Sequence, residues 1–120
     1  MKKKKKIGNQ YDLVKKLELT KKEFIILKRY TEKKGLIFLS TPFDFKSLEI
    51  LNEIGVDGFK ISSGDINNKP FIQKIASLKK PIILSTGTSN LNEIKEALKW
   101  IRKEGNSHIS LLQCTSSYPT

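Results

Sequence analysis

The sequence predicts an α/β fold made of parallel strand–helix units, and three observations support this prediction. Four short apolar runs begin near residues 36, 58, 81 and 108. A segment with helical spacing of its apolar residues separates each run from the next. The runs are nearly continuous in apolar residues, as is typical of strands with both faces covered. We therefore expect a parallel sheet with its helices outside.

Four segments have the pattern of helices, and each begins beside a polar residue that can cap it. They are residues 19–35, 44–55, 68–78 and 90–105, with Thr20, Asp44, Asn68 and Asn90 as the expected caps. Thr20 and Asn90 are each followed three residues later by a glutamate, which is the spacing of a capping box. Pro70 stands in the first turn of the third helix, and Gly55 marks the end of the second.

The strands are expected at residues 35–40, 58–62, 81–86 and 108–114, and hydroxyl groups follow all of them. The segments after the strands read STPF from residue 40, SSGD from 62, STGTS from 85 and CTSSYPT from 114. Ligands of parallel α/β proteins bind at the carboxyl ends of the strands. Lys60 lies in the second strand and would add positive charge there. This edge therefore suits a phosphate or a carboxylate.

A structural explanation of the same residues stays open. Serine and threonine after a strand often form turns or cap the next helix, and this explains Thr88 and Ser89 well. It explains Lys60 poorly, because a lysine in line with a buried strand needs an anionic partner. Asp65 is the candidate for that partner within the chain, and Gly64 is expected to let the loop turn tightly.

The composition limits the other classes of function. The net charge is +11, but five of the lysines form the run at residues 2–6, and only Arg29 and Arg102 are arginines. Specific readers of nucleic acid favour arginine, so we expect no nucleic-acid partner. No run approaches the roughly 20 apolar residues of a membrane span. The single cysteine, Cys114, fits a cytoplasmic protein. Residues 1–16 are expected to be a basic N-terminal segment that is disordered or partly ordered.

Four motifs, taken in order, resemble the sialic acid synthases, the N-acetylneuraminate synthase family. They are FLSTPFD, FKISSGDINNKPFI, KPIILSTGTSNLNEI and LLQCTSSYPT. The resemblance covers residues 17–120 and implies a catalytic TIM barrel. Such a barrel has eight strands and about 250 residues, so the four strands here would be an incomplete barrel, about strands 3 to 6 of 8.

The resemblance also implies roles for individual residues. Lys60 and Asp65 fall at catalytic positions, with Asp65 beside the sugar and the reacting carbons. The positions that hold phosphoenolpyruvate or otherwise contact substrate are those of Thr41, Lys60, Ser63, Asp65, Ser85, Ser116 and Tyr118. Two of these depart from many bacterial members, which have glutamate at the position of Asp65 and often asparagine at that of Ser116.

The family condenses phosphoenolpyruvate with an N-acetylated amino sugar, N-acetylmannosamine or its 6-phosphate, and releases phosphate. A divalent metal, manganese or magnesium, polarises the aldehyde of the sugar. The histidine motifs that hold the metal are absent from these 120 residues, and His108 stands at the start of a strand, on the wrong edge. No metal ligand is therefore expected here. The resemblance further implies a homodimer, or a complementary chain where the gene is split.

We expect these 120 residues to be inactive alone. Two alternatives stay open. One is a synthase of a related nonulosonic acid, of the legionaminic or pseudaminic type. The other is a non-enzymatic half-barrel that binds an anion and pairs with another chain.

Overall fold

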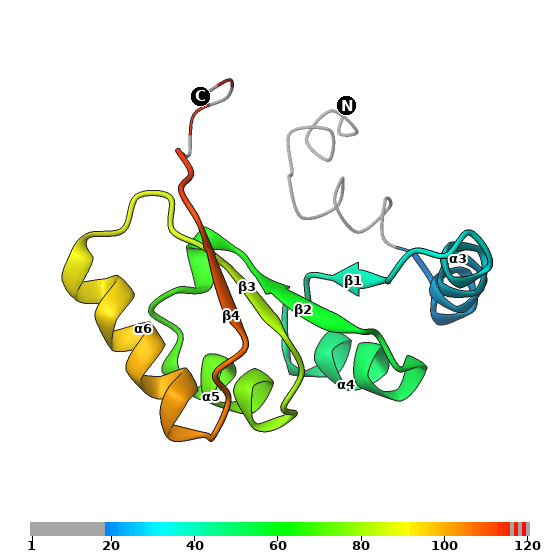
Figure 1. Cartoon of the computed structure of the whole chain (residues 1–120), viewed down its shortest axis with the longest axis horizontal. Helices are drawn as coiled ribbons and strands as arrows, with labels where there is room; N and C mark the ends of the chain where they lie inside the picture. Colours follow the sequence, from blue (N-terminus) through cyan, green and yellow to red (C-terminus); the bar gives the residue numbers. More distant parts are fainter. Residues whose placement is uncertain (1–18, 116, 118, 120) are drawn as a thin grey trace, which may run out of the picture.

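The structure is a computed structural model and describes residues 19–115, 117 and 119. Its centre is a sheet of four strands, β1 (Leu39–Ser40), β2 (Gly58–Ile61), β3 (Ile82–Ser85) and β4 (Ile109–Leu112). Every neighbouring pair is parallel, and the order in space is β1-β2-β3-β4 (Figure 1). The predicted parallel sheet in chain order is confirmed. The predicted basic segment, residues 1–16, lies outside the described residues.

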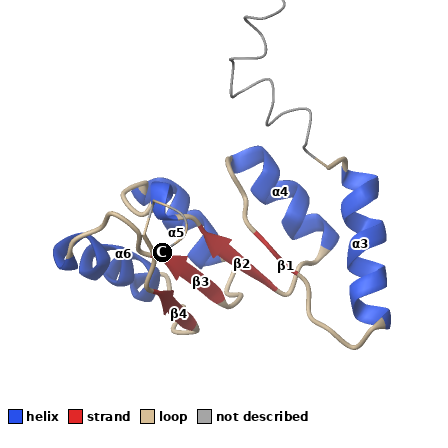
Figure 2. Ribbon diagram, turned by 90° about the horizontal axis from the view of Figure 1, so that it is seen from above, coloured by secondary structure: helices blue, strands red, loops and turns tan. Residues whose placement is uncertain are grey.

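The helices alternate with the strands as predicted. They are α3 (Lys21–Lys33), α4 (Phe45–Ile54), α5 (Lys69–Ser77) and α6 (Leu91–Lys103), and a short 3-10 turn, η1 (Ser63–Asp65), follows β2. Figure 2 shows α4, α5 and α6 on one face of the sheet, with α3 beside α4. The other face of the sheet carries no helix from the described residues.

The core lies between the sheet and these three helices. Side chains alternate along a strand, so Phe59 and Ile61 of β2 point to the helices, as do Ile82 and Leu84 of β3. All four are at most 1% exposed. Burying a large apolar side chain of this kind stabilises the fold by about 1.5–3 kcal/mol. The same alternation places Lys60 on the opposite, uncovered face.

Three of the four predicted caps form hydrogen bonds. Thr20, Asp44 and Asn90 each accept a hydrogen bond from the backbone N–H three residues on, and each belongs to a capping box. Asn68 occupies the cap position of α5, but its side chain makes no cap hydrogen bond. Pro70 in the first turn of α5 has no backbone N–H. One donor fewer needs a hydrogen-bond partner there, so a side-chain cap would stabilise α5 less.

The first strand is shorter than predicted. Residues 35–40 were expected to be extended, yet only Leu39 and Ser40 pair with β2, opposite Gly58 and Phe59. The same register would place residues 36 and 37 opposite residues 55 and 56. Gly55 is the left-handed C-cap of α4, with φ of 88°, so no strand exists there for residues 36 and 37 to pair with.

We expect Asp44→Ala to destabilise the fold by about 1 kcal/mol at neutral pH. The hydrogen bond from the backbone N–H of Ser47, at 2.7 Å, lowers the pKa of Asp44 below its ordinary value of 3.8. A lowered folded-state pKa stabilises the protein above the ordinary value, and this stabilisation is lost as the pH falls through the folded-state pKa. The difference between wild type and variant in urea unfolding should therefore shrink below about pH 4. Asp44→Asn, which keeps the cap but does not titrate, should stay near wild type at pH 7; equal losses in both variants would contradict the capping role.

Candidate functional site

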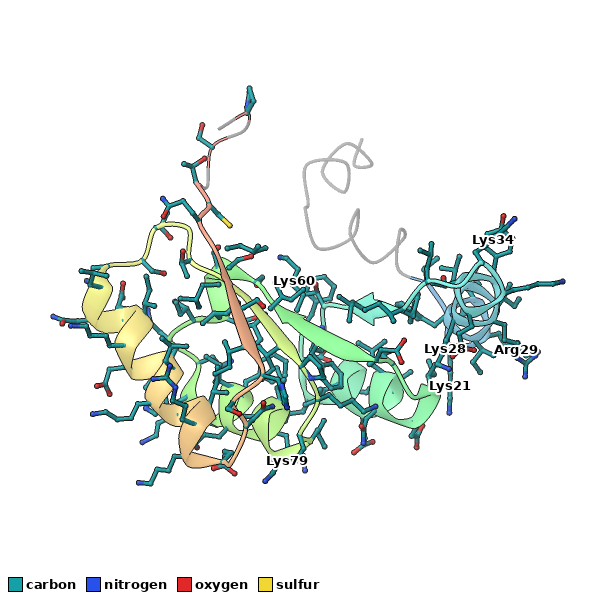
Figure 3. The ribbon with its side chains drawn as sticks, in the orientation of Figure 1. Lys21, Lys28, Arg29, Lys34, Lys60 and Lys79 are labelled. Atoms are coloured by element: carbon teal, nitrogen blue, oxygen red, sulfur yellow. The ribbon has the colours of Figure 1, made fainter. Side chains whose placement is uncertain are left out.

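Three of the predicted site residues lie at one edge of the sheet, because all four strands point the same way. Thr41 follows β1 directly, and the pairing of Ser40 with Phe59 places Thr41 beside Lys60 of β2. Ser85 is the last residue of β3. Figure 3 shows Lys60 towards the carboxyl end of β2 and Lys79 at the other end of the sheet. Thr41, Lys60 and Ser85 thus share the carboxyl edge.

Lys60 is a half-buried cation on the uncovered face of the sheet. Within residues 19–115, the three ion pairs are Lys21–Glu53, Lys28–Glu32 and Lys99–Glu96, and none involves Lys60. The prediction that Asp65 could pair with Lys60 is therefore wrong. The Asp65 carboxylate instead accepts a hydrogen bond from the Ser62 hydroxyl at 3.3 Å. Lys60 is therefore available to an anionic ligand, because no acidic side chain of the described residues pairs with it.

Ser85 strengthens this arrangement. Its residue is only 4% exposed, and its hydroxyl makes no hydrogen bond to the part of the chain that the structure describes. No buried side-chain oxygen of the described residues lacks a hydrogen-bond partner, so the Ser85 hydroxyl reaches solvent at the rim and can donate its proton to a ligand there. Ser85 lies on the same face as Lys60, since Lys60 pairs with Ile83 and Ser85 comes two residues later.

The loops that follow β2, β3 and β4 are tied to one another. The backbone N–H of Gly87 donates to the Ser63 hydroxyl at 2.8 Å. Thr86 donates to the carbonyl of Leu112 through its hydroxyl at 2.8 Å and through its backbone N–H at 3.1 Å. These bonds join the loop after β3 to η1 on one side and to the end of β4 on the other.

A further bond ties the turn after η1 to α6. The Asn67 side-chain amide donates to Glu93 at 3.0 Å, while the same glutamate caps α6 by accepting from the backbone N–H of Asn90. Both hydrogen bonds lower the pKa of Glu93, the one from Asn90 by more than the one from Asn67. The segment that carries Asp65 is thus held on both sides, at Ser63 by Gly87 and at Asn67 by Glu93.

Of the two glycines at this edge, Gly64 differs from the sequence prediction. Gly64 was expected to be needed for a tight turn, but its φ is not in the left-handed region and an added Cβ would meet nothing within 4 Å. The sequence gives no prediction for Gly87, which is buried and touches Ser63. The hydroxyls of Thr88 and Ser89 bond the carbonyl of Gly87, which supports the turn-forming explanation for both.

The remaining candidates are distributed as follows. Ser116 and Tyr118 lie outside the described residues. Cys114 is half-buried after β4, and its thiol contacts the carbonyl of Leu112 at 3.4 Å. His108 precedes β4, at the amino end of the sheet, as predicted. Among residues 19–115, 117 and 119, no three histidine, cysteine or acidic side chains are grouped so that they could hold a metal ion.

Hence the described residues do not fit the divalent metal that the resemblance implies. No helix among them combines the length and the apolar character needed to cross a membrane.

Parallel strand–helix units with a lysine and hydroxyls at the carboxyl edge define a segment of a TIM-barrel protein whose rim suits anions. The model of the NeuB family matches residues 1–120, so the chain belongs to that family. The predicted family resemblance and the partial α/β barrel are both confirmed.

Named relatives agree with this membership. The N,N'-diacetyllegionaminic acid synthase of Campylobacter jejuni is 50% identical over 92% of this chain and 34% of its own length. The human N-acetylneuraminate-9-phosphate synthase is 36% identical over 86% of this chain and 28% of its own length. The chain therefore spans about a third of the length of the curated relatives that it matches.

A solved structure gives the same result for the fold. The crystal structure of an N-acetylneuraminic acid synthetase from Leptospira borgpetersenii, in complex with citrate, superposes with a TM-score of 0.86 at 39% identity. The match covers 97% of this chain and 41% of that one.

Proposed function

We propose that this chain supplies part of the active site of a nonulosonic acid synthase, which condenses phosphoenolpyruvate with an N-acetylated amino sugar. The observation that carries the proposal is Lys60, a half-buried cation that no acidic side chain of residues 19–115 neutralises. Phosphoenolpyruvate carries a phosphate and a carboxylate. Lys60 would neutralise part of that charge, with hydroxyl donors from Thr41, Ser63 and Ser85 around it.

In the proposed reaction, the methylene carbon of phosphoenolpyruvate forms a new bond to the aldehyde carbon of the sugar. The aldehyde oxygen becomes a hydroxyl by taking up a proton. Water then adds to C2 of the former phosphoenolpyruvate, and phosphate leaves with cleavage of the C–O bond. Positive charge held at Lys60 would stabilise the phosphate as it leaves.

Asp65 is proposed to face the sugar. Its carboxylate is bound to the Ser62 hydroxyl and is not neutralised by Lys60, so it stays an acceptor for a sugar hydroxyl or for a proton in transit. Ser116 and Tyr118 are proposed to contact substrate as well. Any divalent metal would take its ligands from outside the described residues, and no step here depends on it.

Two sugars are candidates. N-acetylmannosamine or its 6-phosphate is the first, since the human N-acetylneuraminate-9-phosphate synthase is a relative. The second is the diacetylated sugar of a legionaminic acid synthase, favoured by the higher identity of 50% to the Campylobacter jejuni enzyme. Supplying each sugar separately and weighing the product by mass spectrometry distinguishes them, because the second product carries one more acetamido group.

A non-enzymatic half-barrel would also bind an anion at this rim. It would be recognised by binding of phosphoenolpyruvate without any condensation product when both sugars and manganese are supplied. The protein would act in the cytoplasm under either proposal. The full-length protein would form a homodimer, or, where the gene is split, a complementary chain would complete the barrel.

The test of the proposal is Lys60→Ala in the complete protein that contains these residues. A charged hydrogen bond contributes about 1.5–3 kcal/mol, so we expect the affinity for phosphoenolpyruvate to fall about ten- to hundredfold. Isothermal titration calorimetry measures this loss.

Lys99→Ala is the matched control. Lys99 lies on the exposed surface of α6, with its side chain 71% exposed and 3.6 Å from Glu96. It removes the same charge from the protein without changing the rim, so binding should stay near wild type. Equal affinity in both variants would show that Lys60 does not hold the ligand.

A further inference from the structure

The backbone at Gly87 approaches the loop after β2 so closely that a side chain would fit only if Ser63 moved by a few tenths of an ångström. A Cβ at this position would lie 3.0 Å from the Ser63 hydroxyl oxygen, and 3.5 Å from the Cβ atoms of Ser63 and Cys114. The φ of Gly87 is not in the left-handed region, so glycine is not required by the backbone conformation. The close approach to Ser63 is what favours glycine here.

This approach fixes the direction of the Ser63 hydroxyl group. A serine hydroxyl has one proton to donate and two lone pairs to accept with. The oxygen of Ser63 accepts the N–H of Gly87 at 2.8 Å, and its own proton has no acceptor among the described residues. A hydroxyl that already accepts one hydrogen bond becomes a better donor of the next. The proton of Ser63 is therefore available to an anion at the rim.

Gly87 also connects three loops at once. Its neighbour Thr86 bonds the carbonyl of Leu112 at the end of β4, and the backbone N–H of Gly87 bonds Ser63 of η1. A Cβ at Gly87 would lie 3.5 Å from the Cβ of Cys114 after β4. Displacing Ser63 would therefore disturb the loop after β4 as well.

We propose that Gly87 is a positioning residue, which holds the Ser63 hydroxyl as a donor to phosphoenolpyruvate and locks the loops after β2, β3 and β4 into one rim. This inference rests on the proposed function, because it concerns the same anion. Gly87 itself contacts no reacting atom in this proposal and acts through Ser63.

The test compares Gly87→Ala, Ser63→Ala and the double variant in the complete protein that contains these residues. We expect Gly87→Ala to raise KM for phosphoenolpyruvate about tenfold, with KM for the sugar changed less than twofold, since about 1.4 kcal/mol of donor interaction is lost. Ser63→Ala should have a similar effect. In the double variant the new methyl group meets no hydroxyl, so the effects should not add.

Cys114 provides a readout that does not depend on activity. It is the one cysteine of these 120 residues, and its Cβ would lie 3.5 Å from a Cβ added at Gly87. Alkylation by iodoacetamide, followed by mass spectrometry of the peptide that holds Cys114, should be several-fold faster in Gly87→Ala. Gly64→Ala adds the same methyl group on the same edge where nothing lies within 4 Å, and should keep the wild-type alkylation rate and thermal midpoint.

The outcomes separate the two proposals. A wild type that binds phosphoenolpyruvate, with unchanged KM and unchanged alkylation in Gly87→Ala, overturns the role of Gly87 alone. Fully additive effects in the double variant also overturn it, because Gly87 would then not act through Ser63. A wild type that binds no phosphoenolpyruvate overturns the proposed function, and with it the inference, whatever the alkylation rates show.

Discussion

Purified alone, the 120 residues are expected to self-associate and to form no condensation product. Both edges of the sheet, β1 and β4, lack a neighbouring strand among the described residues. Their unpaired N–H and C=O groups can pair with another chain. Large apolar side chains at or near these edges are exposed, Leu36 by 63%, Ile37 by 70%, Phe43 by 69%, Leu111 by 47% and Leu112 by 40%.

The uncovered face of the sheet adds to this tendency. At its amino end lies a groove of about 510 Å³. Apolar residues make up much of its lining, among them Ile37, Leu39, Ile83 and Ile109. This groove is at the opposite end from the candidate site, so we interpret it as the open interior of a barrel rather than as a ligand pocket. If about 400 Å² of apolar area stays uncovered, the forgone stabilisation is about 10 kcal/mol, comparable to the whole stability of a domain.

Sedimentation velocity over a range of protein concentrations measures the association, and mass spectrometry after incubation with manganese, phosphoenolpyruvate and each sugar measures the product. Leu111→Lys places a charge on the β4 edge and should weaken association at least tenfold, because an edge lysine opposes strand pairing. Leu91→Lys is the control, since Leu91 is 70% exposed on α6, away from the edges. A concentration-independent monomer of the wild type, or any nonulosonic acid product, would show the expectation to be wrong.

The regular elements could be predicted from the sequence because local chemistry decides them. Thr20, Asp44 and Asn90 are followed by partners at the spacing of a capping box, and all three boxes form. The continuous apolar runs predict buried parallel strands, which are observed. The length of β1 could not be predicted, because it depends on the register against β2 and on where α4 ends.

The candidate site was predictable in its position and less so in its contacts. Parallel strands bring their carboxyl ends together, so the shared edge of Thr41, Lys60 and Ser85 follows from chain order. Contacts between loops depend on distances that no spacing rule gives. For this reason the sequence suggested Asp65 as the partner of Lys60, and missed the hydrogen bond between Gly87 and Ser63. The sequence signal for this hydrogen bond was Gly87, which directly follows the Ser-Thr pair at the end of the third strand.

The last prediction concerns the core that holds this edge in place. Phe71 of α5 is 1% exposed and packs edge-to-face on Phe45 of α4, with the ring centres 5.3 Å apart. Phe71→Ala leaves a cavity beneath the sheet, and such cavities cost about 3–5 kcal/mol. Phe45→Ala removes the same ring pair, but Phe45 is 53% exposed, so most of its loss is limited to the pair, about 0.5–1.5 kcal/mol.

Both losses of stability are measured by urea unfolding at one protein concentration. The fluorescence of Trp100, the one tryptophan of the chain, reports the unfolding. Trp100 packs against the core, so it reports on the same cooperative unit. We expect a much larger shift of the midpoint for Phe71→Ala with an unchanged slope. Equal shifts of the urea midpoint in the two variants would mean that burial of Phe71 against the sheet does not determine the stability of α5. In that case the position of Lys60 and Ser85 would have to be maintained by the strand pairing alone.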